Sequence, residues 1–354
     1  MNISVGILTA PNIEFEQRAH TFLLRNVRIG IGFHWDRCED QEFEGALTVL
    51  TNPDGTKTAV NTLPLEDYLT SVISSEMSAD SPVELLKAHA VISRSWALRA
   101  IGHTSHVGYD VCADDHCQRY EGLLRRNPRA VQAIRETQGQ VLTYRNEICD
   151  CRYHKCCGGR TERFSTCWED VDFPYLHPVD CPYCGKAVGN PRLQRLVLNN
   201  YDQETTDFHD WTVRYTAAEL ADIIRTKSGT DFGTILALNP LRRGASGRIC
   251  ELQIVGTKHT AVISKELTIR QFLSHTCLYS SWFDIEKSPA GGEAPSCFIL
   301  RGHGWGHGVG LCQIGAAQMA YDGATYQEIL SRYYPSSRLT AIDTGAASAL
   351  ASRQ

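Results

Sequence analysis

Residues 63–100 read LPLEDYLTSVISSEMSADSPVELLKAHAVISRSWALRA. Apolar residues recur every three or four positions in two runs, and Pro82 separates the runs. This period predicts two α-helices, over about 64–76 and 82–101. Because the connection between them is short, we expect the two helices to pack against each other as neighbours.

The first of these helices ends on an acidic residue that lies on its apolar face rather than on its solvent-exposed face. Glu76 falls within the apolar stripe of the helix, one turn beyond Val72. Desolvation and the negative end of the helix dipole both oppose the ionised carboxylate. We therefore expect the pKa of Glu76 to be raised.

The second helix carries two cations on its apolar face. Lys87 and Arg94 are seven residues apart and nearly in line. Buried cations are rarely left unpaired, so we expect both to converge with Glu76. Helical geometry alone leaves two interpretations open, a buried ion network that fixes helix packing and a catalytic cluster.

Outside this hairpin the pattern is mixed. Residues 4–60 read mostly as strands, a third helix fits 128–138, and further helices are predicted near Gln313 and over about 325–333. Strands and helices in mixed order predict an α+β fold. No internal repeat is visible.

Composition narrows the functional class. The 354 residues are 42% hydrophobic and 21% charged, which is typical of a soluble globular protein. The net charge of −5 argues against nucleic acid or an anionic membrane as the main partner. No apolar run reaches the length of a membrane span, and the first residues do not resemble a signal peptide. Either the protein stays in the cytoplasm or an export signal has been removed.

Four stretches, in order, carry a family resemblance. They are LPLEDYLTSVISSEM with ELLKAHAVISRSWALRA, VCADDHCQRYEG, TQGQVLTYRNEICDCRYHKCCGGRTE, and GHGWGHGVGLCQIGAAQMA. Together they resemble the stage II sporulation protein D family, also called SpoIID/LytB. The resemblance implies mixed strands and helices around a cleft. It covers residues 45–335, which leaves 1–44 as a β-rich N-terminal extension packed on the main domain and 336–354 as a C-terminal tail.

The resemblance also implies an activity. Members are lytic transglycosylases that cut peptidoglycan glycan strands, preferably strands stripped of stem peptides, outside the cytoplasmic membrane. The family's catalytic acid maps onto Glu76, and its polar second-helix positions map onto Lys87, Arg94 and Ser95. His89 stands where the family has glutamine, so no role is transferred to it.

The resemblance implies partners as well as an enzyme. The expected partners are glycan strands and another cell-wall hydrolase or envelope protein, with no nucleic acid and no membrane span in this chain. Some LytB-like proteins are described as amidase enhancers, so a non-catalytic glycan-binding module that stimulates an amidase is the alternative function. The expected location is extracytoplasmic, in the cell envelope or periplasm.

The segment GHGWGHGVG, residues 302–310, places two histidines four residues apart. That is the spacing of two zinc ligands on a helix, but the intervening glycines disfavour a helix and no glutamate follows His303. We favour a loop that approaches a sugar chain, and a tight structural turn is the alternative. The predicted substrate contacts are His303, Trp305, His307 and Gln313.

Fourteen cysteines are many for this length, and half of them cluster between residues 149 and 184. Histidine and cysteine at short spacing, followed by Cys181-Pro-Tyr-Cys184, resemble a zinc pattern. The family resemblance implies a zinc held by histidine and cysteine near this glycine turn, so the predicted ligands are His154, Cys157 and Cys167, holding a structural zinc that the acid chemistry does not require.

Disulfides are the competing interpretation, since an extracytoplasmic compartment permits them. Cys112 and Cys117 fit a small disulfide loop or two free thiols. Cys181 and Cys184 fit either a disulfide or a second half of the metal site. A nucleophilic Cys312, paired with a histidine of the adjacent loop, is a further alternative.

Overall fold

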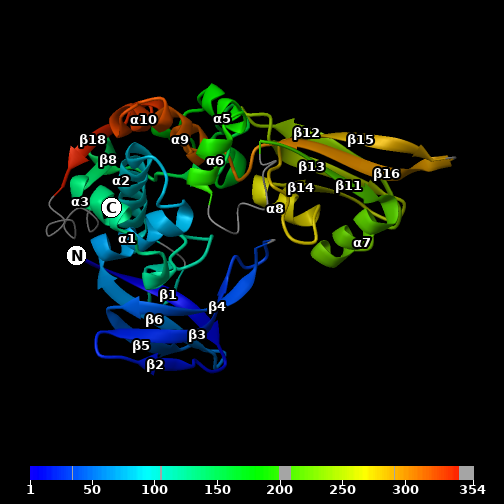
Figure 1. Cartoon of the computed structure of the whole chain (residues 1–354). Helices are drawn as coiled ribbons and strands as arrows, with labels where there is room; N and C mark the ends of the chain where they lie inside the picture. The colour runs from blue at the N-terminus through cyan, green and yellow to red at the C-terminus, as the bar shows by residue number, and fades with distance from the viewer. Residues whose placement is uncertain (34, 104–105, 199–208, 291, 343–354) are drawn as a thin grey trace.

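The two predicted helices form a hairpin within the helical part of the molecule. The structure is a computed structural model that describes residues 1–33, 35–103, 106–198, 209–290 and 292–342. Helix α1 spans Leu65–Glu76 and α2 spans Val83–Ala100, which confirms both predictions. Helix α3, Pro128–Glu136, packs against both, so the hairpin is covered from one side (Figure 1).

Two sheets, in which all pairs but that of β1 (Asn2–Ala10) with β7 (Val111–Cys112) are antiparallel, lie beside this hairpin. Strand β1 lies between β6, Lys57–Pro64, and the short parallel strand β7. Strand β5, Ala46–Thr51, pairs with the other edge of β6. The second layer contains β2 (Phe15–Gln17), β3 (Thr21–Ile29) and β4 (Arg37–Glu44).

The rest of the helical part is built from short elements. In chain order these are η1 (Gly122–Arg125), β8 (Gln140–Tyr144), β9 (Glu147–Ile148), β10 (Tyr153–His154), α4 (Phe164–Cys167), η2 (Pro174–Leu176), α5 (Pro182–Val188), α6 (Pro191–Val197), β17 (Leu311–Cys312), α9 (Gln313–Tyr321), α10 (Tyr326–Tyr333) and β18 (Arg338–Ala341). Of these, β8, β9, α9 and α10 pack directly on α2.

Two chain crossings join distant parts of this region. Strand β10 pairs in parallel with β17, which brings the segment after the hairpin to the start of α9. Strand β18 pairs with β8, so part of the segment predicted as a tail belongs to a sheet. The final residues, 343–354, lie outside the described residues.

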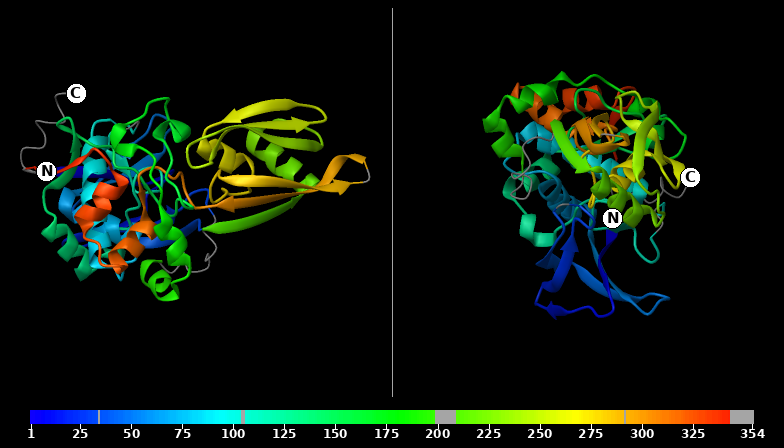
Figure 2. Two further views of the ribbon diagram at one scale, coloured as in Figure 1. Left: turned by 90° about the horizontal axis from the view of Figure 1, so that it is seen from above. Right: turned by 90° about the vertical axis from the view of Figure 1, so that its right-hand side faces the viewer.

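A separate lobe projects to one side of the helical part (Figures 1 and 2). It consists of β11 (Asp210–Thr216), α7 (Ala217–Ser228), β12 (Ile235–Arg243), β13 (Ile249–Gly256), β14 (Thr260–Ser264), α8 (Glu266–Phe272), β15 (Phe283–Ala290) and β16 (Gly292–His303). Two three-stranded sheets, β11-β16-β15 and β12-β13-β14, enclose a hydrophobic core of their own.

These cores show how the chain is divided. One core lies under the N-terminal sheets and the hairpin, a second surrounds α5 and α9, and the third fills the lobe. Strand β1 shares a sheet with β5 and β6, so the boundary predicted at residue 44 runs through a sheet. The single domain predicted for 45–335 contains the lobe as a unit with its own core.

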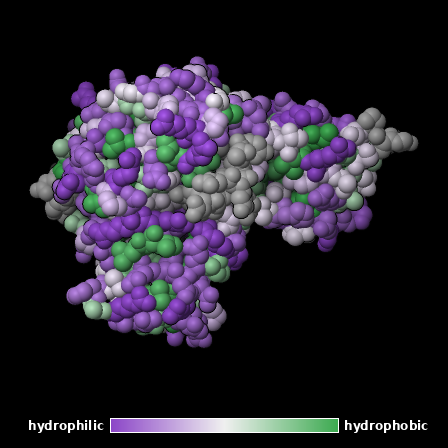
Figure 3. All heavy atoms as spheres, in the orientation of Figure 1, coloured by the Kyte–Doolittle hydropathy of each residue, from purple (hydrophilic) through white to green (hydrophobic). Residues whose placement is uncertain are grey.

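The predicted α+β class is confirmed, with helices and several separate sheets. None of the helices in the described ranges combines the length and apolar character that a membrane crossing requires. On the face shown in Figure 3, apolar residues lie in small separate patches among hydrophilic ones.

Candidate active site

A cleft of about 790 Å³ opens between the helical part and the lobe. Its walls come from the end of α1, the segments 115–119 and 150–155, helix α8 of the lobe, and the glycine-rich loop at 305–307. The volume is in the range of ligand-binding pockets. The predicted cleft is therefore present, and the lobe supplies one of its walls.

Glu76 lies in this cleft at the last residue of α1. Its Oε1 accepts two hydrogen bonds of 2.9 Å, from the backbone N–H of Arg119 and the hydroxyl of Tyr153. Burial raises the pKa of Glu76, while the Arg119 charge opposes the shift and the Asp115 charge adds to it. The carboxyl group thus has the raised pKa that the helix pattern predicted.

A buried network supports the hydroxyl that binds Glu76. The rings of Tyr153 and His89 meet edge to face, with centroids 4.6 Å apart. Nε2 of His89 is 3.1 Å from Nε2 of Gln313, and its Nδ1 is 3.0 Å from the Ser93 hydroxyl. Burial lowers the pKa of His89 to about 3, so this imidazole is neutral at physiological pH. His89 therefore contacts Tyr153 and Gln313 behind the acid.

The predicted convergence of Lys87 and Arg94 with Glu76 does not occur. Lys87 pairs with Glu84 at 3.0 Å and with Glu136 at 2.8 Å. Arg94 is fully buried and forms a bidentate pair with Glu66, at 2.8 and 2.7 Å. Both cations lie on the same helical hairpin as Glu76. The position of a residue around its helix did not show that acids on α1, α2 and α3 would pair with these cations instead.

Ser95, the third second-helix position assigned to substrate, is also structural. Its hydroxyl donates to the Val91 carbonyl at 2.7 Å and accepts the Leu142 N–H at 2.9 Å. Like Lys87 and Arg94, it is absent from the lining of the cleft. Ser95 instead fastens β8 to α2.

The glycine-rich segment is a loop, as predicted, and it divides the four predicted contacts. Trp305, His307 and Gln313 line the cleft, whereas His303 does not. His303 lies at the end of β16, where its Nδ1 is 2.6 Å from Oδ1 of Asp210. Trp305 is 6% exposed and packs against Trp35 and Tyr279, so only a small part of its ring faces the cleft.

The three predicted zinc ligands are not brought together. His154 and Cys167 line the cleft, and Cys167 points at the His307 carbonyl, 3.4 Å away. Cys157 instead lies in a buried group with Cys181, Cys184 and Cys312. Sequence spacing placed these residues near one turn, but it could not show to which side of the turn each side chain points.

Cys312 is completely buried and accepts N–H groups from Cys157 and Gly315. Its side chain lies among other thiols, and no Cys312–histidine pair occurs within the described residues. No cysteine of the chain is in a disulfide. The nucleophile alternative has no geometric support.

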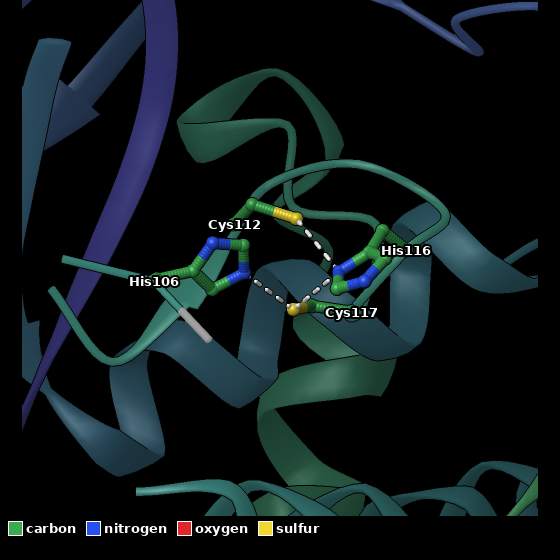
Figure 4. Close-up of side chains that lie close together, drawn as sticks. All are labelled: His106, Cys112, His116 and Cys117. Carbon is green, nitrogen blue, oxygen red and sulfur yellow. Dashed lines mark hydrogen bonds between the residues drawn. The ribbon is translucent and has the colours of Figure 1, made fainter. Parts of the chain in front are cut away.

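A second group of potential metal ligands consists of His106, Cys112, His116 and Cys117 (Figure 4), and His116 and Cys117 line the cleft. Nε2 of His106 is 3.2 Å from Sγ of Cys117, and Nδ1 of His116 is 3.5 Å from the same sulfur and 3.9 Å from Sγ of Cys112. Two thiols and two imidazoles with mutual distances within 4.8 Å suit a tetrahedral zinc ion. The segment then continues to Arg119, whose N–H binds Glu76.

Sequence reasoning overlooked Arg119, Tyr153 and this second group. Arg119, Tyr153 and three members of this group lie in stretches that carried the family resemblance, whereas His106 lies before them. The sequence could not show that Tyr153 contacts Glu76, because the two residues are 77 positions apart in the chain.

Comparison with known proteins finds family models and relatives for this chain. A family model described as "Stage II sporulation protein" matches residues 53–144, and one described as a domain of unknown function, DUF8618, matches 162–310. An uncharacterized protein of Brachyspira hyodysenteriae is 31% identical over 83% of this chain and 71% of its own. Stage II sporulation protein D of Bacillus subtilis is 26% identical over 80% of this chain and 77% of its own.

The chain belongs to the SpoIID family. The amidase enhancer of B. subtilis is also similar, 25% identical over 77% of this chain and 40% of its own. The family is associated with the cell wall. The first family model covers the hairpin and the rim segment, and the second covers the lobe, so the cleft lies where the two matched regions meet.

Proposed function

We propose that this SpoIID-family protein is a lytic transglycosylase that cleaves the glycan strands of peptidoglycan, with Glu76 as general acid and then general base. The observation that carries the proposal is the Glu76 carboxyl group, which lies in the cleft and has a raised pKa. A carboxyl group with a raised pKa holds its proton to higher pH and is therefore suited to donate it.

The hydrogen bonds of Glu76 assign its two oxygens different roles. Oε1 accepts both bonds, from the Arg119 N–H and the Tyr153 hydroxyl, and within the described residues nothing donates to Oε2. Oε2 is therefore the oxygen that carries the proton. It gives this proton to the glycosidic oxygen as the bond to the anomeric carbon breaks.

The second half of the reaction needs no other acid. The 6-hydroxyl of the same sugar attacks the oxocarbenium-like carbon, and the Glu76 carboxylate takes the hydroxyl proton. The product is an anhydro-muramyl end, and Glu76 is protonated again for the next cycle. Ordinary glycosidases instead use two carboxyl groups. Asp115 also lines the cleft but is paired with Arg119 at 3.0 Å.

The cleft also offers groups that suit a peptide-stripped glycan. Removal of the stem peptide leaves a free lactyl carboxylate on each muramic acid. Arg152 and Lys155 line the cleft and are cations suited to such a carboxylate, although Arg152 also pairs with Asp150 at 2.8 Å. Trp168 and Trp305 add aromatic surface that suits sugar rings.

Zinc has a structural role in this proposal, and the acid–base chemistry needs no cofactor. The group of His106, Cys112, His116 and Cys117 would hold the ion at the rim of the cleft. Bound there, the ion would fix the segment that leads to Arg119 and thereby the N–H that binds Glu76.

A second candidate function follows from the similarity to an amidase enhancer. A glycan-binding module of this kind would use the cleft for binding and would stimulate another cell-wall hydrolase. Its expected location, like that of the enzyme, is outside the cytoplasmic membrane.

Mass spectrometry of peptide-free glycan strands after incubation with the protein separates these functions. Anhydro-muramyl ends are the expected result. Reducing ends would instead mean that water attacks, with Asp115 as a second carboxylate. Intact strands, together with faster release of peptides by an added amidase, would establish the binding module and overturn the enzyme.

A further inference from the structure

Four cysteines from three separate segments meet in the core around α5 and α9. Cys157 precedes the glycine turn at 158–159, Cys181 and Cys184 flank the start of α5, and Cys312 lies directly before α9. All four side chains are completely buried. The chain brings them together from positions up to 155 residues apart.

Their sulfur atoms have the spacing of a metal site rather than of disulfides. All four Sγ atoms lie within 4.8 Å of one another, and those of Cys157 and Cys184 are 3.5 Å apart. A tetrahedral zinc ion with Zn–S bonds of about 2.3 Å holds its sulfurs about 3.8 Å apart. A disulfide requires about 2.05 Å.

Backbone N–H groups point at these sulfurs. The N–H of Cys157 lies 3.2 Å and that of Gly315 3.4 Å from Sγ of Cys312, while the N–H of Gly159 lies 3.4 Å from Sγ of Cys157. Hydrogen bonds of this kind favour the thiolate over the thiol, and they form the outer shell that orients metal ligands. Without a bound metal, these N–H groups would donate to neutral thiols, which are weak hydrogen-bond acceptors.

The residues packed around the four sulfur atoms leave little free space. A methyl group added at Gly315 would come within 2.5 Å of Sγ of Cys181 and 2.4 Å of the Tyr333 hydroxyl. Arg248, also fully buried, donates to the Cys157 carbonyl at 3.2 Å and places a positive charge beside the group. Four thiolates with one divalent cation leave a net negative charge, which this guanidinium partly offsets.

We propose that Cys157, Cys181, Cys184 and Cys312 bind one zinc ion in a closed tetrahedral site. The four thiols release their protons to solvent as the metal enters, and no group is oxidised or reduced. Because all four positions are filled by protein, the ion has no open coordination site and its role is structural.

The proposed zinc site holds together two segments that lie next to the cleft. It joins the start of α9, where Gln313 contacts the His89 network, to the turn after His154. The same turn accepts a hydrogen bond from Arg248 of the lobe, so the zinc also anchors the junction of lobe and helical part. This inference does not depend on the glycan chemistry of Glu76.

Native mass spectrometry of protein purified under reducing conditions with zinc counts the bound ions. We expect Cys184→Ser to lose one metal equivalent relative to the wild type. Cys297→Ser, at a buried cysteine outside the group, is the matched control and should lose none. His116→Ala serves to remove the ion of the rim group, so that the remaining equivalent belongs to the four cysteines.

Two further measurements cover a variant that fails to fold. Cobalt substitution in the His116→Ala protein should give the strong visible and near-ultraviolet absorption of tetrahedral tetrathiolate cobalt. Peptide mapping should show that the four thiols react with an alkylating agent only after a chelator is added. A His116→Ala protein that binds no metal, or a wild type in which these cysteines form disulfides under the same conditions, would overturn the proposal.

Discussion

The two ends of the α1–α2 hairpin each place a charge on an apolar helix face, with opposite consequences. At one end Arg94 is fully buried and engages both oxygens of Glu66. At the other end Glu76 faces the cleft, and no ion pair to it occurs within the described residues. The first charge is neutralised and stabilises packing, whereas the second keeps a raised pKa.

The difference shows that a charged residue within an apolar stripe can be expected to be buried. The stripe does not show whether that charge stabilises packing or takes part in catalysis. Desolvation acts on both side chains, and the partner decides the result. A bidentate carboxylate holds Arg94 charged, while a backbone N–H and a phenol leave Glu76 able to take up a proton. Five substitutions or conditions test this contrast.

The largest effect is expected for Glu76→Gln. The amide cannot donate a proton to the glycosidic oxygen, so we expect glycan cleavage to fall about 10²–10⁴-fold. Anhydro-end formation by mass spectrometry measures the change, and circular dichroism verifies the fold. Glu136→Gln, an exposed acid on α3, is the control and should keep its activity. Full activity of a folded Glu76→Gln protein would remove the proposed mechanism.

Arg94→Ala should act on stability instead. Removing one partner of a buried ion pair leaves Glu66 uncompensated, so we expect the free energy of unfolding to fall by about 3 kcal/mol. Urea denaturation measures it. Activity per folded molecule should change little, because Arg94 does not line the cleft. A large loss of activity in protein shown to be folded would place Arg94 in the catalytic machinery after all.

At the rim of the cleft, His116→Ala should loosen the segment that leads to Arg119. We expect activity to drop about 10-fold, the lower range for loss of support around a metal or its ligands. Addition of a zinc chelator to the wild type should give a similar loss without abolishing cleavage. Complete loss on chelation would indicate that the metal takes part in the chemistry.

The pH dependence of stability gives a smaller effect with a defined sign. Burial raises the pKa of Glu76 above its ordinary value of 4.5, so between that value and the raised one the folded state binds more protons than the unfolded state. Wild-type stability contributed by Glu76 is therefore lost as pH rises through this window. Glu76→Gln should gain stability relative to the wild type on going from pH about 4 to neutrality. An unchanged difference would mean that the pKa is not raised.

Lys87→Ala should have the smallest effect. Lys87 forms exposed or half-buried ion pairs with Glu84 and Glu136, and such pairs contribute about 0–1 kcal/mol. We expect a change of that size in urea denaturation and no change in glycan cleavage. Impaired cleavage would revive the predicted role of Lys87 in substrate binding.

The amino-acid sequence by itself determined the hairpin, the α+β class and the position of the acid. Apolar periodicity placed both helices within one or two residues of α1 and α2, and it showed Glu76 within an apolar stripe. These features depend on neighbours three or four positions apart, which the sequence displays directly.

Only the tertiary structure decided the partners of each charge and each thiol. Arg94 pairs with Glu66, Tyr153 reaches Glu76, and Cys157 joins Cys312 rather than His154. It also separated the lobe, with its own core, from the domain predicted over 45–335. Such contacts link residues far apart in the chain, and their formation depends on packing and on which nearby opposite charge is closest, neither of which a helical or spacing pattern contains.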